Sequence, residues 1–275
     1  MPNTVRSTWP ANLNNVGKAK DVQMPSVTSN DAPRPTRRER LRAELTTEIK
    51  AVARRQLEQD GPGAVSWRGI ARDVGMSPAS LYTYFESLDD LYTHLIADSF
   101  RSHAAALQRA VNSMEGRPLA DRLFAAKIAY REWAVRHPGE FRLVYNNLLP
   151  DYEAPEDGPT TAATIAVGEV FLLLLHEGWR SGEVQPAPSG PRVDTKRLTD
   201  AYDIEISSDE FRTAIGAWGM IHGLTSLEVN HHLSEEWVDA ATLYLAEMRT
   251  LHRSWGLPEP GDDVADSAAA AAAAG

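Results

Sequence analysis

Residues 66–91 read SWRGIARDVGMSPASLYTYFESLDDL, which is the pattern of two short helices joined by a tight turn. Ser66 is a suitable N-cap, because a serine hydroxyl accepts a hydrogen bond from the first free N–H groups of a helix. Gly75 is a suitable C-terminal residue, because glycine adopts the left-handed backbone that ends a helix. We expect the first helix to bury the apolar residues of one face, Ile70, Ala71 and Val74.

The second helix of the pattern exposes a polar face. Ser77 is a second N-cap and Pro78 suits the first helical position, while Leu81 and Phe85 lie one turn apart and should face inward. The remaining side chains are small, hydroxylic or phenolic: Ala79, Ser80, Tyr82, Thr83 and Tyr84. Such a face fits the major groove of DNA, where small residues allow close approach and hydroxyls meet bases or phosphates. An ordinary helical hairpin with partly buried tyrosines is the alternative.

The same residues resemble a known family. The resemblance is carried by Gly69-Ile70-Ala71, Val74-Gly75-Met76-Ser77, Leu81-Tyr82-Thr83-Tyr84-Phe85 and Leu91. At this spacing the segment resembles the N-terminal domain of the TetR family of bacterial transcriptional regulators. It departs from the family at Tyr84, where histidine is frequent, and at Leu88, where a phosphate-binding lysine is frequent. Because Leu88 cannot replace a cation, phosphate anchoring must come from other residues, for which Arg34, Arg37, Arg38, Arg40 and Arg68 are available.

The pattern and the resemblance together imply a set of DNA-binding residues. Those expected to face the DNA from the second helix and the turn before it are Met76, Ser77, Pro78, Ala79, Ser80, Tyr82, Thr83 and Tyr84. We expect Ser66 and Arg68 to reach phosphate, and Arg37 and Arg38 to flank the site.

The net charge of −10 conceals an uneven distribution of charge. The window from Arg34 to Ser87 contains ten Lys and Arg residues and seven Asp and Glu residues, which gives +3 and leaves −13 for the rest of the chain. A modestly basic head on an acidic body can meet DNA at one face while the body discourages nonspecific adhesion.

Length and composition limit the other possibilities. A chain of 275 residues is long enough for one large or two smaller domains. It contains no cysteine, which excludes disulfides and thiolate metal sites. We find no secretory signal and no apolar run long enough to cross a bilayer, since the run Phe171–Leu175 ends in His176 and Glu177. These features predict a cytoplasmic protein that needs neither a cofactor nor a metal.

Helical periodicity runs almost throughout the chain, so we expect an all-α fold of about nine helices. The expected domains are a disordered arm over 1–33, a helix-turn-helix domain over 34–87, a ligand-binding and dimerisation domain over 88–257, and a disordered Ala-rich tail over 258–275. The first helix carries the apolar stripe Leu41, Leu45, Ile49, Val52, Ala53 and Leu57 and stops near 60–63. A fourth helix runs from 88 to 114, and others lie near 118–137, 139–148, 161–181, 209–232 and 235–255. The loop over 182–208 looks too polar for the core.

The C-terminal helices are rich in aromatic residues, most of which should be core. Tryptophan and tyrosine tips with a few polar groups among them can also enclose an apolar ligand cavity. The expected ligand-binding residues are Phe100, His103, Trp133, Phe141, Tyr145, Phe171, Trp179, Trp218 and His222. A hydrogen-bonded core histidine is the alternative interpretation of His222. In the family, an effector in such a cavity usually releases the DNA, which implies a repressor that responds to a small apolar or amphipathic molecule.

Residues 218–228 read WGMIHGLTSLE, which resembles the Trp-His-Gly signature of one class of TetR-like C-terminal domains. Small residues on this helix allow another helix to approach closely: Ala214, Gly216, Ala217, Gly219 and Gly223. With the helix over 235–255 it would form half of a four-helix homodimer interface. Two heads related by a twofold axis read half-sites about 34 to 36 Å apart, so we predict a palindromic double-stranded operator.

Two rival functions remain to be weighed. A helical metal-dependent enzyme would begin from Glu228 and His231, which have the carboxylate–histidine spacing of di-iron bundles. A second such motif is missing, since neither Glu169 nor Glu177 has a histidine three residues later. The G-x-S-x-G motif of serine hydrolases is also absent from the sequence. We therefore predict no enzymatic activity. The other rival is a DNA-binding dimer whose body binds no small ligand and acts as a constitutive or protein-docking regulator. A closed core without a cavity would favour it.

Overall fold

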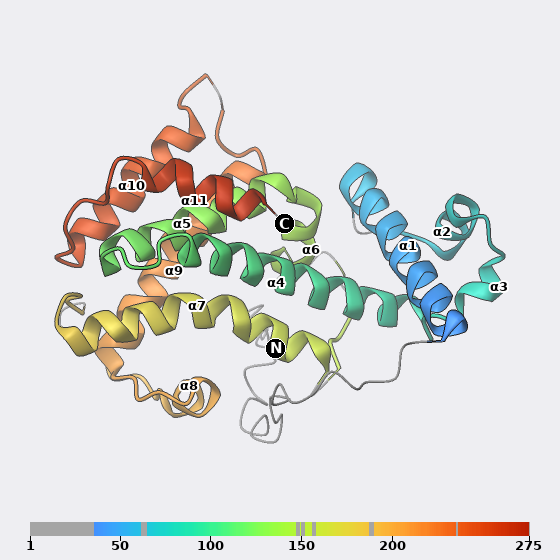
Figure 1. Cartoon of the computed structure of the whole chain (residues 1–275), viewed down its shortest axis with the longest axis horizontal. Coiled ribbons are helices and arrows are strands. Elements are labelled where there is room, and N and C mark those ends of the chain that lie inside the picture. The colour runs from blue at the N-terminus through green and yellow to red at the C-terminus, as the bar shows by residue number, and fades with distance from the viewer. Residues whose placement is uncertain are drawn as a thin grey trace, which may run out of the picture. The chain divides into compact units, whose positions relative to one another are not determined.

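The structure, a computed structural model, describes residues 36–61, 65–146, 149, 152–155, 158–186, 190–234 and 236–274. Every regular element in this part of the chain is an α-helix, which confirms the all-α prediction (Figure 1). The helices are α1(Arg37–Asp60), α2(Trp67–Val74), α3(Pro78–Leu81), α4(Leu88–Asn112), α5(Leu119–Arg136), α6(Pro138–Tyr145), α7(Pro159–Ser181), α8(Lys196–Tyr202), α9(Ser208–Val229), α10(Ala240–Ser254) and α11(Val264–Ala273). The arm expected over 1–33 lies outside the described residues.

The chain divides into two compact units. The first unit comprises the described residues up to Ser99 together with those in Gly139–Thr161, and the second comprises those in Phe100–Pro138 and from Ala162 onward. The boundaries fall inside α4 and α7. The first unit therefore contains the first half of α4 and all of α6 except Pro138, in addition to α1, α2 and α3. It is larger than the head expected over 34–87.

The core of the first unit follows the predicted helix faces with three exceptions, one of which is Leu45 of α1, which is only half-buried. Side chains that are at most 3% exposed are Ile49, Val52, Ala53, Leu57, Ile70, Ala71, Leu81, Phe85, Leu91 and Leu95. Leu41, expected at the start of the apolar stripe of α1, is 55% exposed. Val74, expected in the core face of α2, is only half-buried. The buried part of α1 therefore begins at Ile49, about three turns after the N-terminus of the helix, and α2 packs against α1.

α5 is the central helix of the second unit. It packs against α9, α10 and α11, and 13 of its 18 residues are buried. Burial on all sides explains why α5 shows little amphipathic pattern, because a helix surrounded by others is apolar around most of its circumference. Two ionisable residues, Asp121 and Lys127, are nonetheless buried on it.

The C-terminal tail contains a helix, which corrects the prediction of a disordered segment over 258–275. α11 lies along α5 and buries Val264, Ala268 and Ala272 (Figure 1). Alanine has the highest intrinsic helix propensity, and its small side chain lets two helices approach closely. The alanine tract was misread as low-complexity sequence, because composition alone does not reveal that α5 offers a surface for it.

Two arginines hold the ends of α11. At its start, the Arg117 guanidinium donates two hydrogen bonds to the Asp263 carboxylate, at 2.8 and 2.9 Å. At its end, the Arg109 guanidinium donates to the carbonyl oxygens of Ala271 and Ala272, at 3.2 and 2.9 Å. A cation at the C-terminal carbonyls of a helix is favourable, because those oxygens lack intrahelical partners and carry the negative end of the helix dipole.

The loop expected over 182–208 is also more ordered than its composition suggests. It contains α8, and Val184 and Ile206 on either side of that helix are only 1% and 5% exposed. Burial raises the pKa of Tyr202 in α8 to about 12. This segment therefore contributes apolar side chains to the second unit, contrary to our expectation, and with α11 it accounts for the two helices beyond the nine expected.

α7 is long and apolar enough to cross a membrane by length and composition alone. The core helix of a soluble protein meets the same criterion. Six of its apolar side chains are buried within the second unit: Ala163, Val167, Val170, Leu172, Leu174 and Leu175. We therefore interpret α7 as a core helix, although our reading of the sequence did not recognise its overall apolar character.

Candidate nucleic-acid interface

The helix-turn-helix forms around the predicted caps. The Ser66 hydroxyl accepts a hydrogen bond from the Gly69 N–H at 3.2 Å and caps α2. Gly75 adopts the left-handed conformation, with φ 75° and ψ 28°. The Met76 N–H then donates to the Ala71 carbonyl at 2.9 Å, which completes the C-terminal turn of the helix. The sequence therefore identified both the start and the end of α2.

α3 starts as predicted but is shorter than predicted. The Ser77 hydroxyl accepts a hydrogen bond from the Ser80 N–H at 3.2 Å, and Pro78 occupies the first helical position. The α-helix ends at Leu81, and the next turn is held by tighter i to i+3 bonds such as that from the Thr83 N–H to the Ser80 carbonyl at 3.2 Å. Such bonds have poorer geometry than α-helical ones, so this turn depends more on contacts from elsewhere.

α3 and the turn after it present the expected polar face. The exposed residues are Ser77, Pro78, Ala79, Tyr82 and Thr83, and the half-buried ones are Met76, Ser80 and Tyr84. On the opposite side, Leu81 and Phe85 are 0% and 2% exposed. Tyr82 is 55% exposed, and its ring lies 5.6 Å from that of Trp67 in α2. The inward and outward sides of this segment thus lie as predicted, while contact of the outward side with DNA stays a prediction.

Arg42 of α1 contacts this segment, a contact that the sequence did not reveal. Its guanidinium donates a hydrogen bond to the Thr83 carbonyl at 2.8 Å. The same guanidinium carbon lies 5.5 Å from the centroid of the Tyr84 ring. Arg42 and Thr83 are 41 residues apart in sequence, and no spacing rule predicts a contact over that distance.

The predicted phosphate-binding cations within the described part of the chain are exposed. Arg37 and Arg38 lie in the first turn of α1, and Arg68 lies in the first turn of α2. A capping box fixes the start of α1, in which the Glu39 N–H donates to the Thr36 hydroxyl at 3.2 Å and the Thr36 N–H donates to the Glu39 carboxylate at 2.7 Å. That backbone hydrogen bond lowers the pKa of Glu39 below its usual value. Arg34 lies outside the described residues.

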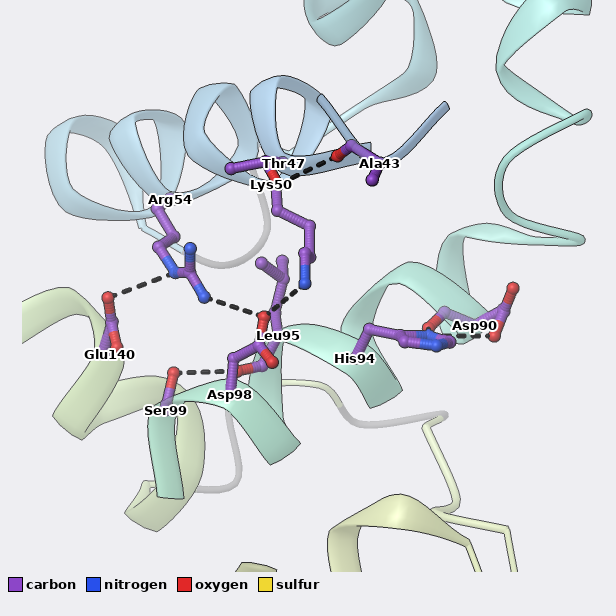
Figure 2. A network of polar contacts seen from close by, with 10 residues as sticks. All are labelled: Ala43, Thr47, Lys50, Arg54, Asp90, His94, Leu95, Asp98, Ser99 and Glu140. Atoms are coloured by element: carbon purple, nitrogen blue, oxygen red, sulfur yellow. Dashed lines mark hydrogen bonds and ion pairs between the residues drawn. The ribbon is translucent and has the colours of Figure 1, made fainter. Parts of the chain in front are cut away.

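Ion pairs connect α1 to α4 and α6 within the first unit (Figure 2). Lys50 and Arg54 of α1 both reach the Asp98 carboxylate of α4, at 2.7 and 3.0 Å. Arg54 also approaches the Glu140 carboxylate of α6 at 3.3 Å. Asp98 and Glu140 are only 19% and 9% exposed, so solvent screens these pairs less than pairs at the surface. This charge cluster of Lys50, Arg54, Asp98 and Glu140 holds α1 against α4 and α6.

The second unit contains a tightly packed aromatic cluster. His103 of α4 stacks on Trp133 of α5, with ring centroids 4.2 Å apart and an interplanar angle of 9°. The Trp133 indole N–H donates to the Ser102 hydroxyl at 3.0 Å. Burial lowers the pKa of His103 to about 3, so its ring is neutral at physiological pH.

Tyr130 joins the two sides of this cluster. Its ring lies 4.5 Å from that of His103, and its hydroxyl lies 2.9 Å from Nδ1 of His222. His222 stacks on Trp218 at 4.6 Å, and burial lowers the pKa of His222 to about 4. The ring of Phe171 lies 6.2 Å from that of Tyr130. Five predicted ligand-binding residues therefore meet around Tyr130, which was not among them because an aromatic residue in an Ala-rich helix looks like ordinary core.

The other four predicted ligand-binding residues are Phe100, Phe141, Tyr145 and Trp179. Phe141 and Tyr145 belong to the first unit, where their rings lie 4.9 Å apart. Phe100 is 6% exposed, and Trp179 is half-buried with its indole N–H buried and unpaired within the described structure. The second unit also has a groove of about 380 Å³, lined by Ala104, Ala105, Gln108, Ala166, Glu169, Val170 and Leu173. None of the predicted ligand-binding residues lines this groove.

The residues that suggested an enzyme have another role. The Glu228 carboxylate accepts hydrogen bonds from two nitrogens of the Arg131 guanidinium, at 2.7 and 2.5 Å. His231 lies beyond the end of α9, in a left-handed backbone conformation with φ 57°, and is exposed. Within the described residues no cluster of three or more His, Asp or Glu side chains is arranged to hold a metal ion.

Comparison with known families agrees with this geometry. Residues 49–95 match the model of bacterial regulatory proteins of the tetR family, and residues 123–251 match the tetracyclin repressor-like C-terminal domain. The first match covers the helix-turn-helix, and the second covers the aromatic cluster except His103, and most of α10. By fold and by these matches the chain is a helix-turn-helix transcriptional regulator.

Individual relatives extend the agreement over most of the chain. The HTH-type transcriptional regulator Rv1816 of Mycobacterium tuberculosis is 28% identical over 220 residues, which are 78% of this chain and 94% of that protein. The solved regulatory protein SCO4313 is 31% identical, with a TM-score of 0.62 over 78% of this chain and 98% of that one. FadR from Bacillus subtilis, solved with stearoyl-CoA, shares the fold at 13% identity, with a TM-score of 0.52 over 75% of this chain and 95% of that one. The chain belongs to the TetR family of DNA-binding transcriptional regulators, which is not a family of enzymes.

Proposed function

We propose that this protein reads a palindromic operator as a homodimer, through α3 and the turn that follows it. The observation that carries the proposal is the exposed polar face of Ser77, Ala79, Tyr82 and Thr83, directly opposite the buried Leu81. Small side chains let the helix enter the major groove, and hydroxyl tips can meet base edges or phosphates. Arg37, Arg38, Ser66 and Arg68 are proposed to meet phosphate beside it.

Selection of bound duplexes from a random DNA pool, with the full-length protein, tests this proposal. We expect a palindromic consensus with half-sites about 34 to 36 Å apart, as two heads of a symmetric dimer require. Fluorescence anisotropy then measures affinity for the selected duplex and for a scrambled one. Enrichment of no sequence over several rounds, or equal affinity for both duplexes at every salt concentration, would reject specific operator binding.

Two substitutions separate phosphate contacts from base reading. If the Tyr84 hydroxyl meets a phosphate, Tyr84→Phe should weaken binding to all sequences by a similar factor. A substitution at Ala79, such as Ala79→Ser, should instead change which selected sequence binds best. Equal losses on all sequences for both variants would contradict this division of roles.

We propose that the dimer forms through α9 and α10. One face of α9 carries Ile215, Met220 and Leu227, which are 38%, 36% and 39% exposed. A Cβ added at Gly216, Gly219 or Gly223 of the same helix meets no atom within 4 Å of the single chain. Exposed apolar side chains beside glycines fit a helix that packs closely against a copy of itself across a twofold axis.

The aromatic cluster around Tyr130 is the proposed effector site. Its histidines are neutral, because burial lowers their pKa values to about 3 and about 4, so the site suits an uncharged apolar or amphipathic molecule. The sequence over 218–228 further suggests a C-terminal domain of the Trp-His-Gly type, and FadR, which shares the fold, was solved with an acyl-CoA. An effector that binds more tightly to a conformation of the C-terminal domain other than the DNA-binding one would lower the affinity for DNA, by the ratio of its affinities for the two conformations. We therefore propose that the protein is a repressor that the effector releases from DNA.

Thermal-shift screening of neutral hydrophobic molecules, followed by operator-release assays in a cytoplasm-like buffer, tests the effector proposal. The close stacking within the cluster favours a second candidate, a constitutive or protein-docking regulator that binds no small molecule. Molecules that raise the melting temperature of the protein and also release the selected duplex would support the effector. Indifference of DNA affinity to every binder would favour the second candidate.

A further inference from the structure

The turn that follows α3 is held from outside by Arg42, an exposed residue of α1. Its Nη2 donates to the Thr83 carbonyl at 2.8 Å, and its guanidinium carbon lies 5.5 Å from the centroid of the Tyr84 ring. Thr83 and Tyr84 are two of the residues proposed to face DNA. A single side chain therefore touches both of them from a helix that is distant in sequence.

The local structure explains why this turn benefits from an external partner. α3 is a single helical turn, and beyond Leu81 the backbone is held by two i to i+3 bonds and by one i to i+4 bond, from the Phe85 N–H to the Leu81 carbonyl at 3.1 Å. The carbonyls at the end of a helix lack intrahelical donors, and a guanidinium supplies a charge-assisted donor for one of them. The planar guanidinium also lies near the aromatic face of Tyr84, an arrangement that a lysine ammonium cannot reproduce together with the same hydrogen bond.

Tyr82 is held by a different neighbour. Its ring lies 5.6 Å from that of Trp67 of α2, whereas Arg42 contacts Thr83 and Tyr84. The two phenols of the recognition segment are therefore positioned from two different helices. A change at Arg42 should loosen Tyr84 and leave Tyr82 in place.

We propose that Arg42 is a positioning residue for operator recognition: it orders Thr83 and Tyr84 before the DNA arrives, and it does not itself bind a phosphate. This inference rests on the proposed function of α3 as the DNA reader. It assigns to Arg42 a role distinct from that of Arg37, Arg38 and Arg68, whose proposed partners are phosphates.

The test compares Arg42→Ala and Arg42→Lys with the wild-type full-length protein on the selected duplex and on a scrambled duplex. Positioning by the guanidinium predicts that both variants lose roughly tenfold in affinity for the selected duplex, a loss typical of a hydrogen bond to a charged group. Affinity for the scrambled duplex should fall by a smaller factor, because that duplex loses the proposed phosphate contact of Tyr84 but no base contact. Arg55→Ala is the matched control, because it removes the same charge from an exposed position of α1, and it should retain the preference for the selected duplex.

Salt dependence separates positioning from direct phosphate contact. A lost phosphate contact lowers the slope of log affinity against log salt by about 0.9, whereas a lost positioning residue leaves the slope unchanged. An Arg42→Lys variant that binds like the wild type, or an Arg42→Ala variant with a slope reduced by about 0.9, would overturn the inference. If the wild-type protein selects no sequence at all, the proposed function fails instead, so the two failures are distinguishable.

A double-mutant cycle with Tyr84→Ala keeps the inference testable if Arg42→Ala changes overall stability. Tyr84→Ala removes the ring that Arg42 contacts and leaves the Thr83 carbonyl in place, so Arg42→Ala should cost less in the Tyr84→Ala background than in the wild type, although some loss remains. Far-UV circular dichroism and the melting temperature confirm that each variant is folded. Full additivity of the two losses would show that Arg42 acts independently of Tyr84 and would overturn the inference.

Discussion

Gly139, in the first turn of α6, lies directly against the backbone of Glu58 in α1. A Cβ added at Gly139 would stand 3.0 Å from Cα and 3.2 Å from N of Glu58, which is closer than nearly all real contacts. Neither backbone atom can move aside as a flexible side chain would. Glycine at this position therefore lets α6 meet the helix that carries Arg42.

We expect Gly139→Ala to force α1 and α6 apart and to reduce the free energy of unfolding by about 1–3 kcal/mol, the usual cost of inserting a methyl group into a closely packed contact. Denaturant unfolding measures the change, and affinity for the selected duplex shows whether displaced α1 impairs DNA reading. An unchanged unfolding midpoint would mean that the two helices separate without strain.

The charge cluster that fixes α1 should contribute to the stability of the first unit. Asp98→Asn removes the carboxylate shared by Lys50 and Arg54 and leaves two partly buried cations with one fewer counter-ion. We expect a loss of about 1–3 kcal/mol in the free energy of unfolding, which is more than an exposed pair contributes, because breaking a shielded pair leaves uncompensated charge. Asp262→Asn, which makes the same change at an exposed position, is the control. Equal effects of the two variants would contradict this role.

The features of this structure that were predictable from the sequence are those that depend on contacts between residues close together in the chain. The caps at Ser66 and Ser77 and the left-handed Gly75 depend on hydrogen bonds between residues at most five apart. The contact of Arg42 with Thr83 spans 41 residues, and that of Lys50 with Asp98 spans 48. Such contacts follow from how helices pack, which periodicity does not specify, so the predicted face of α3 was correct while its supports were missed.

The same reason explains the errors in the second unit. Helical periodicity located α5, α7, α9 and α10, but it did not indicate which aromatic residues meet. Tyr130 was not among the expected ligand-binding residues, and Phe141 and Tyr145 were grouped with residues of a different compact unit. The alanine tract of α11 has a strong helix propensity, but the tract alone does not show that α11 packs on α5. That packing depends on the side of α5 that the other helices leave uncovered.

Lys127 should make stability depend on pH. Its ammonium nitrogen is buried 2.9 Å from Nδ1 of His252 and 4.3 Å from the centroid of the Trp255 ring, and burial lowers the pKa of Lys127 well below its usual value. Between that lowered pKa and the unfolded value near 10.5, the unfolded chain binds more protons than the folded one. The free energy of unfolding should therefore rise as pH increases through this window.

Lys127→Met isolates this contribution, because methionine has a similar length and no charge. Urea unfolding at several pH values from about 7 to 9.5 should give a smaller increase in stability with pH for the variant than for the wild type, by up to about 1.4 kcal/mol per pH unit where one proton is released on folding. His252, whose pKa burial lowers to about 3, acts at lower pH and does not titrate in this range. Parallel curves for the two proteins would show that Lys127 does not titrate abnormally.

The proposed dimer face can be tested without disturbing the single chain. Gly219 of α9 has no atom within 4 Å of an added Cβ, so Gly219→Gln should fold normally. Across a close helix–helix contact the longer side chain would block association, and sedimentation equilibrium should give a monomer. Affinity for a duplex with two half-sites should then fall at least tenfold. Val135→Gln, on α5 and outside the proposed face, should stay dimeric, and a dimeric Gly219→Gln would exclude this part of α9 from the interface.

Removal of α11 tests whether the C-terminal helix belongs to the fold of the second unit. A chain that ends at Gly261 loses the burial of Val264, Ala268 and Ala272 on α5. It also loses the carbonyls of Ala271 and Ala272 that Arg109 contacts and the Asp263 carboxylate that Arg117 contacts. The truncation removes the three buried side chains and exposes the surface of α5 that they cover. We therefore expect a loss of about 2–4 kcal/mol in the free energy of unfolding. Because α11 packs on α5 and not on α3, the truncated protein should still prefer the selected duplex. A truncated protein of unchanged stability would show that α11 contributes nothing to the core.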